Sequence, residues 1–182
     1  MSNTIHSIKY LASGTPDKIN VVVEIPRGSN LKYEVDEETG MLFVDRKLFT
    51  AMYYPCNYGF IPSTLEGDGD PVDVLVLGEF SVHPMSVIRA HPVGILFTED
   101  EEGQDSKVVA VPINKIDPTF SNVKDVNDIS EPIRKQIEHF FEHYKELEGG
   151  KYVKIAGWGN KNEAEQRISE AMANFKKNSI RI

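Results

Sequence analysis

The sequence predicts a mainly β fold, a small barrel or sandwich, with two α-helices packed against it. Two observations lead to this prediction. Short segments rich in β-branched residues, separated by Gly, Pro and Asp clusters, follow one another through the first two thirds of the chain. After Asp117 the apolar residues recur instead at the spacing of an amphipathic helix.

The predicted strands come first along the chain. Val21–Ile25 is an apolar run, interrupted by Glu24, that stops at Pro26. Lys32–Asp36 and Met41–Arg46 alternate polar with apolar residues on either side of a Glu-Glu-Thr-Gly turn, which is typical of a β-hairpin. Further β-branched segments are Val72–Leu77, Ser86–Arg89, Val93–Phe97 and Lys107–Val111.

Two helices are expected after the strands. Ser130 can cap the first, whose opening turn holds Glu131 and Pro132 and which is expected to end at Gly149-Gly150. Its apolar stripe comprises Ile133, Ile137, Phe140, Phe141, Tyr144 and Leu147. A second helix is expected from about Glu163 to Lys177, with one apolar stripe formed by Ala164, Ile168, Ala171, Met172 and Phe175.

Composition limits the class of protein. The 182 residues, 40% hydrophobic and 26% charged, are expected to form a single domain over residues 1–182. No apolar stretch approaches the ~18 residues of a membrane span, and Met1–Pro16 lacks the apolar run of a secretory signal, so we expect a cytoplasmic protein without a membrane partner. The single cysteine, Cys56, excludes an intramolecular disulfide. The net charge of −8 disfavours nucleic acid as a partner.

Carboxylates are concentrated in one short segment, residues 68–73, which reads Asp-Gly-Asp-Pro-Val-Asp and runs directly into an apolar strand. Three carboxylates this close repel one another unless cations neutralise them, and hard oxygen ligands favour Mg²⁺, Mn²⁺ or Ca²⁺. In a fully extended segment Asp70 and Asp73 would point to opposite faces, so a shared site requires a turn, which Gly69 and Pro71 can supply. The alternative is a solvated turn with scattered acids.

Other acids lie outside this segment. Glu24 interrupts an apolar strand, where an unpaired buried carboxylate would cost several kcal/mol, so it requires a partner. A second acidic run, residues 99–105, precedes Lys107 and a predicted strand. Taken alone, that run is typical of a polar hairpin turn.

Basic and phenolic residues form a complementary set. Lys32, Glu34 and Arg46 lie on the predicted hairpin, and three tyrosines lie in the segment Tyr53–Phe60. Each has an alternative explanation, because Lys32 and Glu34 can form a surface ion pair and the tyrosines can be core residues with satisfied hydroxyls. Their combination with the carboxylates is what indicates a functional site.

Together these residues resemble the family I soluble inorganic pyrophosphatases, metal-dependent hydrolases that cleave pyrophosphate to two orthophosphates. The family's signature motif is matched in full by Asp68-Gly69-Asp70-Pro71-Val72-Asp73-Val74. The resemblance spans nearly the whole chain in order, over residues 22–26, 32–46, 51–59, 92–111, 124–128 and 140–145. It implies a five-stranded OB-like barrel with two flanking α-helices and, as in bacterial members of this length, a homo-oligomer that is a hexamer.

The resemblance also implies a role for each candidate residue. Carboxylates that would bind metal ions are Asp68, Asp73 and Asp105, with Asp100 and Glu24 holding further ions that arrive with the substrate and Glu34 in a supporting position. Side chains that would hold the phosphate groups are Lys32, Arg46, Tyr58, Tyr144 and Lys145, with Lys107 in the same cavity. Asp70 matches the acid that orients and deprotonates the attacking water.

These residue types suit the hydrolysis of pyrophosphate. The substrate is a polyanion, so an incoming nucleophile is repelled and the leaving phosphate must take on more charge. Several Mg²⁺ ions, for which Mn²⁺ or Zn²⁺ can substitute, would activate a water for direct attack and neutralise the phosphate oxygens. Asp70 would act as the general base, while lysine, arginine and tyrosine stabilise the departing phosphate.

Two other functions are alternatives. His139, Glu142 and His143 fit the H-x-x-E-H pattern of a zinc hydrolase, although on the predicted helix they fall away from the apolar stripe. An OB-type module that only binds a ligand is the non-enzymatic alternative, and the net acidity opposes a nucleic-acid ligand. Phosphate release with Mg²⁺ distinguishes these functions from pyrophosphate hydrolysis.

Overall fold

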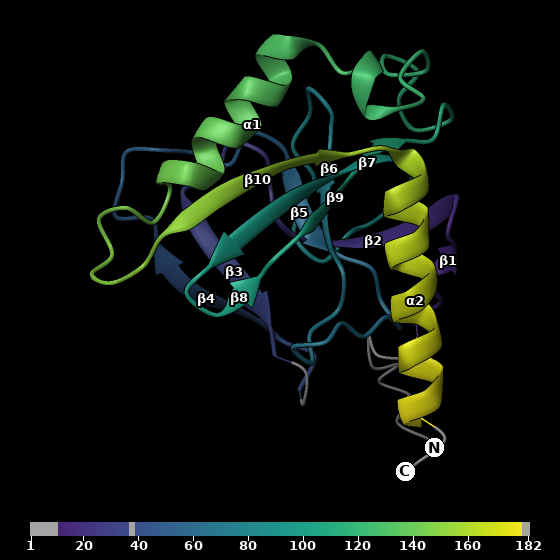
Figure 1. The fold of residues 1–182 in the computed structure, drawn as a ribbon, viewed down its shortest axis with the longest axis horizontal. Helices are drawn as coiled ribbons and strands as arrows, with labels where there is room; N and C mark the ends of the chain where they lie inside the picture. Colours follow the sequence, from purple (N-terminus) through teal and green to yellow (C-terminus); the bar gives the residue numbers. More distant parts are fainter. Residues whose placement is uncertain (1–10, 37–38, 180–182) are drawn as a thin grey trace.

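The computed structural model describes residues 11–36 and 39–179. In this part of the chain the fold is mainly β with two α-helices, as the sequence predicts (Figure 1). The strands are β1 (Gly14–Thr15), β2 (Lys18–Ile25), β3 (Leu31–Val35), β4 (Leu42–Lys47), β5 (Asn57–Phe60), β6 (Asp73–Val76), β7 (Val87–Asp100), β8 (Gly103–Gln104), β9 (Lys107–Pro112) and β10 (Val153–Gly159). The helices are α1 (Glu131–His143) and α2 (Lys161–Ser179), with a short 3₁₀ helix at Val126–Asp128. Neither described α-helix is long and apolar enough to cross a lipid bilayer.

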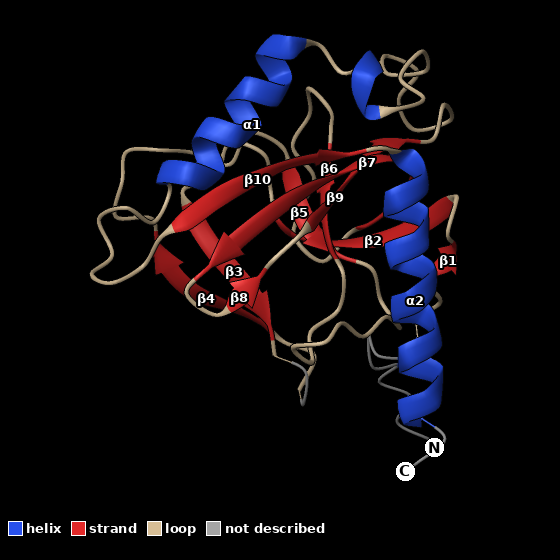
Figure 2. Ribbon diagram, viewed as in Figure 1, coloured by secondary structure: helices blue, strands red, loops and turns tan. Residues whose placement is uncertain are grey.

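Five strands pair in a circuit that returns to its starting strand. β2 pairs with β5, β5 with β6, β6 with β9, β9 with β7, and β7 again with β2. Val22 lies at the junction, opposite Phe60 of β5 and Val87 of β7. The β6–β9 pairing is parallel and the other four are antiparallel. β10 adds to the free side of β7, whereas β3 and β4 form a separate hairpin (Figure 2).

Alternation along the strands divides the core into two clusters of buried side chains. Leu75 of β6 belongs to the cluster that contains Phe141 of α1. Its neighbour Val74 belongs to the other cluster, which contains Ile168 of α2. Because successive side chains of a strand point to opposite faces and each face is covered, β6 is apolar without a break from Val74 onward. Each helix therefore covers its own part of the strand assembly, as Figure 2 shows.

The strands differ from the prediction in several places. The predicted strands at 86–89 and 93–97 are one continuous strand, β7, whose pairing with β9 shifts register between Pro92 and Gly94. Proline has no N–H to donate to a ladder, and a local irregularity lets the strand continue past it. β1, β5, β8 and β10 were not predicted, and β5 lies within the segment that the sequence suggested was an aromatic loop.

The first helix is shorter than predicted. It ends at His143 instead of Gly149-Gly150, and Tyr144 is its C-terminal cap. Leu147, which the sequence placed on the apolar stripe, is 62% exposed. Ser130 is at the N-cap as predicted, but its side chain makes no capping hydrogen bond. The residues after His143 form separate turns, and these turns direct Lys145 and Glu148 into buried ion pairs.

Gly59 is the point of closest approach between strands β5 and β2. A Cβ atom at Gly59 would lie 1.9 Å from the backbone oxygen of Val22 and 2.8 Å from its carbonyl carbon. Neither atom can move without separating the two strands. The close approach therefore requires a residue without a side chain at this position.

We expect Gly59→Ala to lower the free energy of unfolding by at least about 3 kcal/mol, because the strands must part to accommodate the methyl group. Gly67→Ala is the matched control, since a Cβ at Gly67 has no neighbour within 4 Å. Denaturant titration should show the control within about 0.5 kcal/mol of the wild type. Equal unfolding midpoints for the two variants would contradict this role of Gly59.

Candidate active site

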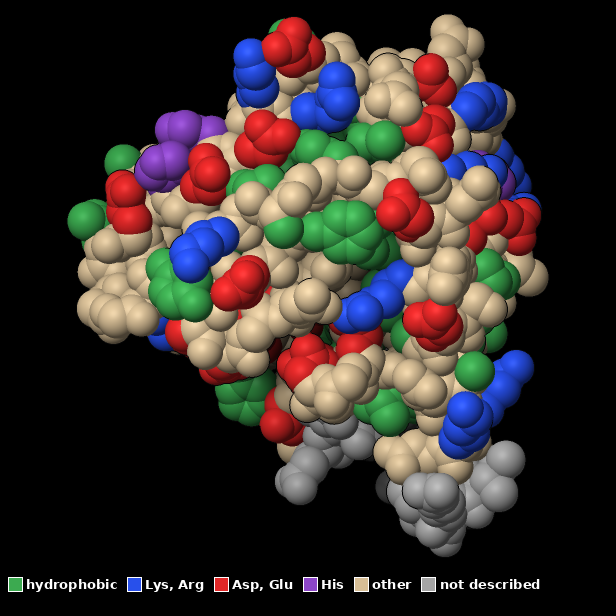
Figure 3. Space-filling model, viewed as in Figure 1, with side chains coloured by type: hydrophobic (Ala, Val, Ile, Leu, Met, Phe, Trp, Pro, Cys, Tyr) green, Lys and Arg blue, Asp and Glu red, His purple; other side chains and the backbone are tan. Residues whose placement is uncertain are grey.

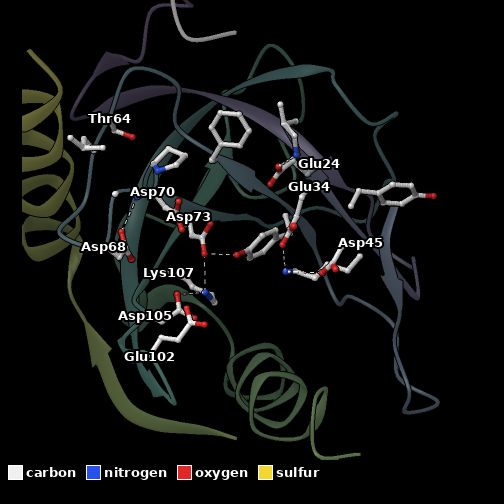
Figure 4. Close-up of a pocket in the computed structure, with 18 of the residues that line it drawn as sticks. Glu24, Glu34, Asp45, Thr64, Asp68, Asp70, Asp73, Glu102, Asp105 and Lys107 are labelled. Atoms are coloured by element: carbon white, nitrogen blue, oxygen red, sulfur yellow. Dashed lines mark hydrogen bonds and ion pairs between the residues drawn. The ribbon is translucent and has the colours of Figure 1, made fainter. Parts of the chain in front are cut away.

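One large polar cavity, of about 1100 Å³, opens between the β3–β4 hairpin, the strand ends of β6 and β9, and the segment that follows α1. Its lining includes every residue to which the family resemblance assigned a role: Glu24, Lys32, Glu34, Arg46, Tyr58, Asp68, Asp70, Asp73, Asp100, Asp105, Lys107, Tyr144 and Lys145. Figure 4 shows Asp68, Asp70, Asp73 and Asp105 on one side of the pocket with Lys107, and Glu24 and Glu34 across from them. Residues far apart in the chain are thus brought to one place.

The parallel pairing of β6 and β9 creates the acidic side of this pocket. Val74 lies opposite Val108 in the ladder, so the residues that begin the two strands, Asp73 and Lys107, are neighbours at the same edge. The ammonium of Lys107 lies 2.9 Å from Asp73 Oδ2 and 2.7 Å from Asp105 Oδ1. The Tyr58 hydroxyl donates a hydrogen bond to the same oxygen of Asp73. Two carboxylates and a phenol therefore converge around one cation.

Lys107 is a buried charge, since its side chain is only 3% exposed. Burial opposes the ammonium form, but the nearby carboxylates of Asp73 and Asp105 outweigh it and raise the pKa of Lys107 above its usual value. Burial, together with the Asp73 carboxylate, also raises the pKa of Tyr58 well above its usual value. Both side chains consequently stay protonated and act as donors at neutral pH.

The signature segment forms the turn that a shared site requires. Gly69 has φ +104°, a conformation that favours glycine, and the backbone N–H of Asp70 donates to Asp68 Oδ1 at 3.0 Å. The loop is anchored from outside: the Leu65 N–H donates to the carbonyl oxygen of Ala171 in α2 at 3.0 Å. As a result, Asp68 and Asp70 lie in the pocket beside Asp73.

Glu24 has the partner that its position in an apolar strand requires. The backbone N–H of Val35 donates to Glu24 Oε1 at 2.8 Å. Burial nevertheless raises the pKa of Glu24 to about 8, and the nearby Asp73 and Glu34 carboxylates add to the rise while the Val35 bond opposes it. A cation at this place would favour the ionised carboxylate.

The cations of the pocket are paired with acids, several of which the sequence analysis missed. Lys32 contacts Glu34 and also Asp45, at 3.2 Å. Arg46 contacts Asp45, and its Nε lies 2.9 Å from Glu148 Oε1. Lys145 lies 2.9 Å from Asp100 Oδ2 and 3.2 Å from Glu101 Oε2. Glu101 lies in the acidic run 99–105 but was assigned no role, whereas Asp45 and Glu148 carried no local signal apart from the position of Asp45 beside Arg46.

Of the three tyrosines in the segment 53–60, only Tyr58 lines the pocket. Tyr54 is buried in the core, and Tyr53 is 58% exposed at the surface. The core explanation therefore applies to Tyr54. Cys56 is a buried free thiol, and burial raises its pKa to about 12, which suits a small core residue.

The histidine pattern does not form a comparable site. The rings of His139 and His143 stack with their centroids 4.4 Å apart, and His143 Nδ1 is hydrogen-bonded to the His139 carbonyl oxygen at 2.9 Å. Neither histidine lines the cavity, and histidine side chains lie on the outer surface over the end of α1 (Figure 3). Within the described residues no three His, Cys, Asp or Glu side chains are close enough together to hold a metal ion as they stand. In the pocket, the cation between Asp73 and Asp105 is Lys107.

The fold and the site together define a class of protein: a mainly β protein whose open pocket sets carboxylates against lysine, arginine and tyrosine donors, an arrangement suited to a polyanion and its counter-ions. The family model described as inorganic pyrophosphatase matches residues 21–176. The chain therefore belongs to the inorganic pyrophosphatase family and is an enzyme, as its resemblance to that family implied.

Individual relatives are similar to this chain over most of its length. The inorganic pyrophosphatase of Saccharolobus solfataricus is 62% identical over 157 residues, which cover 86% of this chain and 91% of that protein. The solved structure of the Helicobacter pylori inorganic pyrophosphatase is 49% identical, with a TM-score of 0.89 and coverage of 91% of this chain and 97% of that one. That of the Thermus thermophilus enzyme is 41% identical, with a TM-score of 0.90 over 93% and 99% of the two chains.

The raised pKa of Glu24 predicts a specific pH dependence of stability. The unfolded chain loses this proton near the ordinary value of 4.5, whereas the folded protein retains it to about 8. Between these values the folded state binds more protons, so the ionisation of Glu24 lowers the free energy of unfolding as the pH rises. Glu24→Gln removes this loss, and in chelator its stability relative to the wild type should be greater at about pH 9 than at about pH 5.

Thermal unfolding of both proteins across this pH range, in EDTA, checks the prediction. Glu79→Gln is the control, because Glu79 is an exposed surface carboxylate. A difference between Glu24→Gln and wild type that stays constant with pH would show that the folded protein does not hold the Glu24 proton.

Proposed function

We propose that this chain hydrolyses inorganic pyrophosphate to two orthophosphates in a Mg²⁺-dependent reaction, by direct attack of a metal-activated water with Asp70 as the general base. Membership of the inorganic pyrophosphatase family supports the substrate and the reaction. The observation that carries the proposal is the meeting of an acidic group (Asp68, Asp70, Asp73 and Asp105) and a cationic group (Lys32, Arg46 and Lys145) in one cavity. The first suits divalent ions and the second suits phosphate.

The carboxylates of the pocket fit a divalent cation. Lys107 demonstrates that Asp73 and Asp105 can direct oxygens at a single positive charge. Those two residues with Asp68 would hold the activating ions, and Asp100 and Glu24 would hold ions that accompany the substrate. Carboxylate oxygens are the ligands that Mg²⁺ prefers, and Mn²⁺ or Zn²⁺ can use an overlapping set. When bound, the ions would lower the pKa of water and neutralise charge on the phosphate oxygens.

The cationic side chains would bind the two phosphate groups. Arg46 offers a planar guanidinium that can contact two phosphate oxygens at once, while Lys32 and Lys145 supply compact charges. Tyr58 and Tyr144 keep their protons, because burial raises the pKa of each hydroxyl, and they can donate hydrogen bonds without adding charge. Glu34 would support this set by holding Lys32 in place.

Asp70 is suited to the role of base by its position. It is an exposed carboxylate in the cavity, between two acids assigned to metal ions, and its backbone is fixed by the hydrogen bond to Asp68. In this role it would orient a water and accept its proton as the bond to phosphorus forms. As that bond forms, the bond between phosphorus and the bridging oxygen would break, and the leaving phosphate would take the electron pair, its added charge being neutralised by Lys32, Arg46 and Lys145.

The proposal extends to the architecture and the assembly. We take the circuit β2–β5–β6–β9–β7 to be a five-stranded OB-like barrel flanked by α1 and α2, within a single domain that spans residues 1–182. A homo-oligomer, specifically a hexamer, agrees with the large apolar side chains exposed on the described surface, which include Phe43, Val44 and Phe49. A cytoplasmic location agrees with the free buried thiol of Cys56.

Phosphate release from pyrophosphate tests the proposed reaction. We expect rapid release with Mg²⁺ and none in EDTA, because chelation removes the ions that the carboxylates would hold. The same assay with Zn²⁺ as the only metal covers the histidine hypothesis. Release that persists in EDTA, or that requires Zn²⁺ and fails with Mg²⁺, would reject the Mg²⁺-dependent mechanism.

The role of Asp70 is tested by Asp70→Asn, which preserves shape and removes the base. We expect kcat to fall by about 10²–10⁴-fold while Mg²⁺ and pyrophosphate still bind in calorimetry. Glu102→Gln is the matched control, since Glu102 also lines the cavity and has no proposed role. Turnover of Asp70→Asn equal to that of Glu102→Gln would remove Asp70 from its role.

A further inference from the structure

An uninterrupted series of ion pairs of alternating sign runs around the cationic side of the pocket. It connects, in order, Glu34, Lys32, Asp45, Arg46, Glu148, Lys151, Glu101, Lys145 and Asp100. One half lies on the β3–β4 hairpin and the adjoining residues, and the other half lies on the β7–β8 turn and the segment after α1. Glu148 is the residue at which the two halves meet.

Glu148 is the least exposed acid of the series, with 8% of its side chain accessible. Its Oε1 accepts a hydrogen bond from Arg46 Nε at 2.9 Å, and its Oε2 lies 3.8 Å from the ammonium of Lys151. A buried carboxylate is costly unless cations compensate its charge, so this position depends on Arg46 more than on the distant Lys151.

The backbone around Glu148 is held by two turns. The Glu148 N–H donates to the carbonyl oxygen of Lys145 at 3.0 Å, and the Lys151 N–H donates to that of Glu148 at 3.1 Å. Gly150, with φ +80°, has the left-handed conformation that the second turn needs at its third residue. These two turns therefore fix the position of the backbone that carries the Glu148 carboxylate.

The contact between Arg46 and Glu148 joins segments that are 102 residues apart. This contact is important because, among the residues that the structure describes, the β3–β4 hairpin is a separate sheet with no strand pairing to the main one. Asp45 and Glu148 contact two of the three guanidinium nitrogens of Arg46, Nη1 and Nε. Since guanidinium is planar, two fixed nitrogens set the orientation of the third.

We propose that Glu148 is a positioning residue that orients the Arg46 guanidinium toward a phosphate group of pyrophosphate. The inference rests on the proposed function, and it assigns Glu148 no contact with substrate, since Glu148 does not line the cavity whereas Arg46 does. Its effect on binding passes through Arg46.

Replacement of Glu148 by glutamine tests this role. Glu148→Gln keeps the shape and one acceptor oxygen but removes the charge, and KM for pyrophosphate should rise about tenfold with kcat within about twofold of wild type. Glu146→Gln is the matched control, because Glu146 is an exposed acid in the same segment and should leave both constants unchanged. If Glu148→Gln fails to fold by circular dichroism, Glu148→Asp replaces it, with a smaller rise in KM expected.

A double-mutant cycle separates positioning from a general structural role. In an Arg46→Ala background the change at Glu148 should alter KM by no more than about twofold, because its target is gone. The same cycle with the binding constant of imidodiphosphate, which resists hydrolysis, gives a readout that does not depend on turnover. Equal effects in both backgrounds, or KM and binding constants equal to those of Glu146→Gln, would overturn the inference. If the wild type shows no turnover but the binding constants of imidodiphosphate still show the expected coupling between Glu148 and Arg46, the proposed function is rejected and the positioning role remains.

Discussion

The ammonium of Lys107, buried between Asp73 and Asp105, is the interaction on which the acidic side of the pocket depends. Without a positive charge at this point, two partly exposed carboxylates would face each other with no cation between them, which is energetically unfavourable. The parallel pairing of β6 and β9 is what puts Lys107 there, because it aligns the first residues of both strands. Two largely buried strands therefore determine the geometry of the acidic side of the pocket.

On the opposite side of the pocket the charges are reversed: cations lie close together, and carboxylates compensate them. Lys32, Arg46 and Lys145 each contact carboxylates, so each of these three cations already has an anionic partner. Under the proposed function, a polyanionic substrate would compete with those carboxylates for the cations, and divalent ions would compete with Lys107 for Asp73 and Asp105. Binding is then an exchange of partners within a preformed array of charges, which limits how far side chains must be reorganised.

Sequence patterns were informative where one local rule dominates. The β3–β4 hairpin has its alternation and its turn in one short segment, and α2 has an uninterrupted apolar stripe, so both were predicted close to their observed bounds. β5 was missed because its four residues, which include Tyr58 and Gly59, show no strand pattern of their own. Their extended conformation comes from pairing with β2 and β6. The end of α1 was misplaced because Leu147 continues the helical spacing although the chain has already turned.

The candidate site shows the same division. The carboxylates of residues 68–73 were evident from their density, and the signature motif directed attention to residues elsewhere in the chain. Glu148 was not found, and Glu101 was noted only as part of an acidic run, because what distinguishes both residues is contact with Arg46 and Lys145 at long sequence separation. No local pattern encodes such a contact; it exists only once the hairpin and the segment after α1 have been placed.

The circuit of strands has a consequence for how the protein becomes active. β2 closes the circuit by pairing with β7, and the pocket draws its lining from Glu24 of β2 to Ser179 of α2, so no short fragment of the chain contains a complete site. Catalytic competence should accordingly emerge late during refolding, after the pairings between distant segments have formed, and a nascent chain still lacking its last third would be inert.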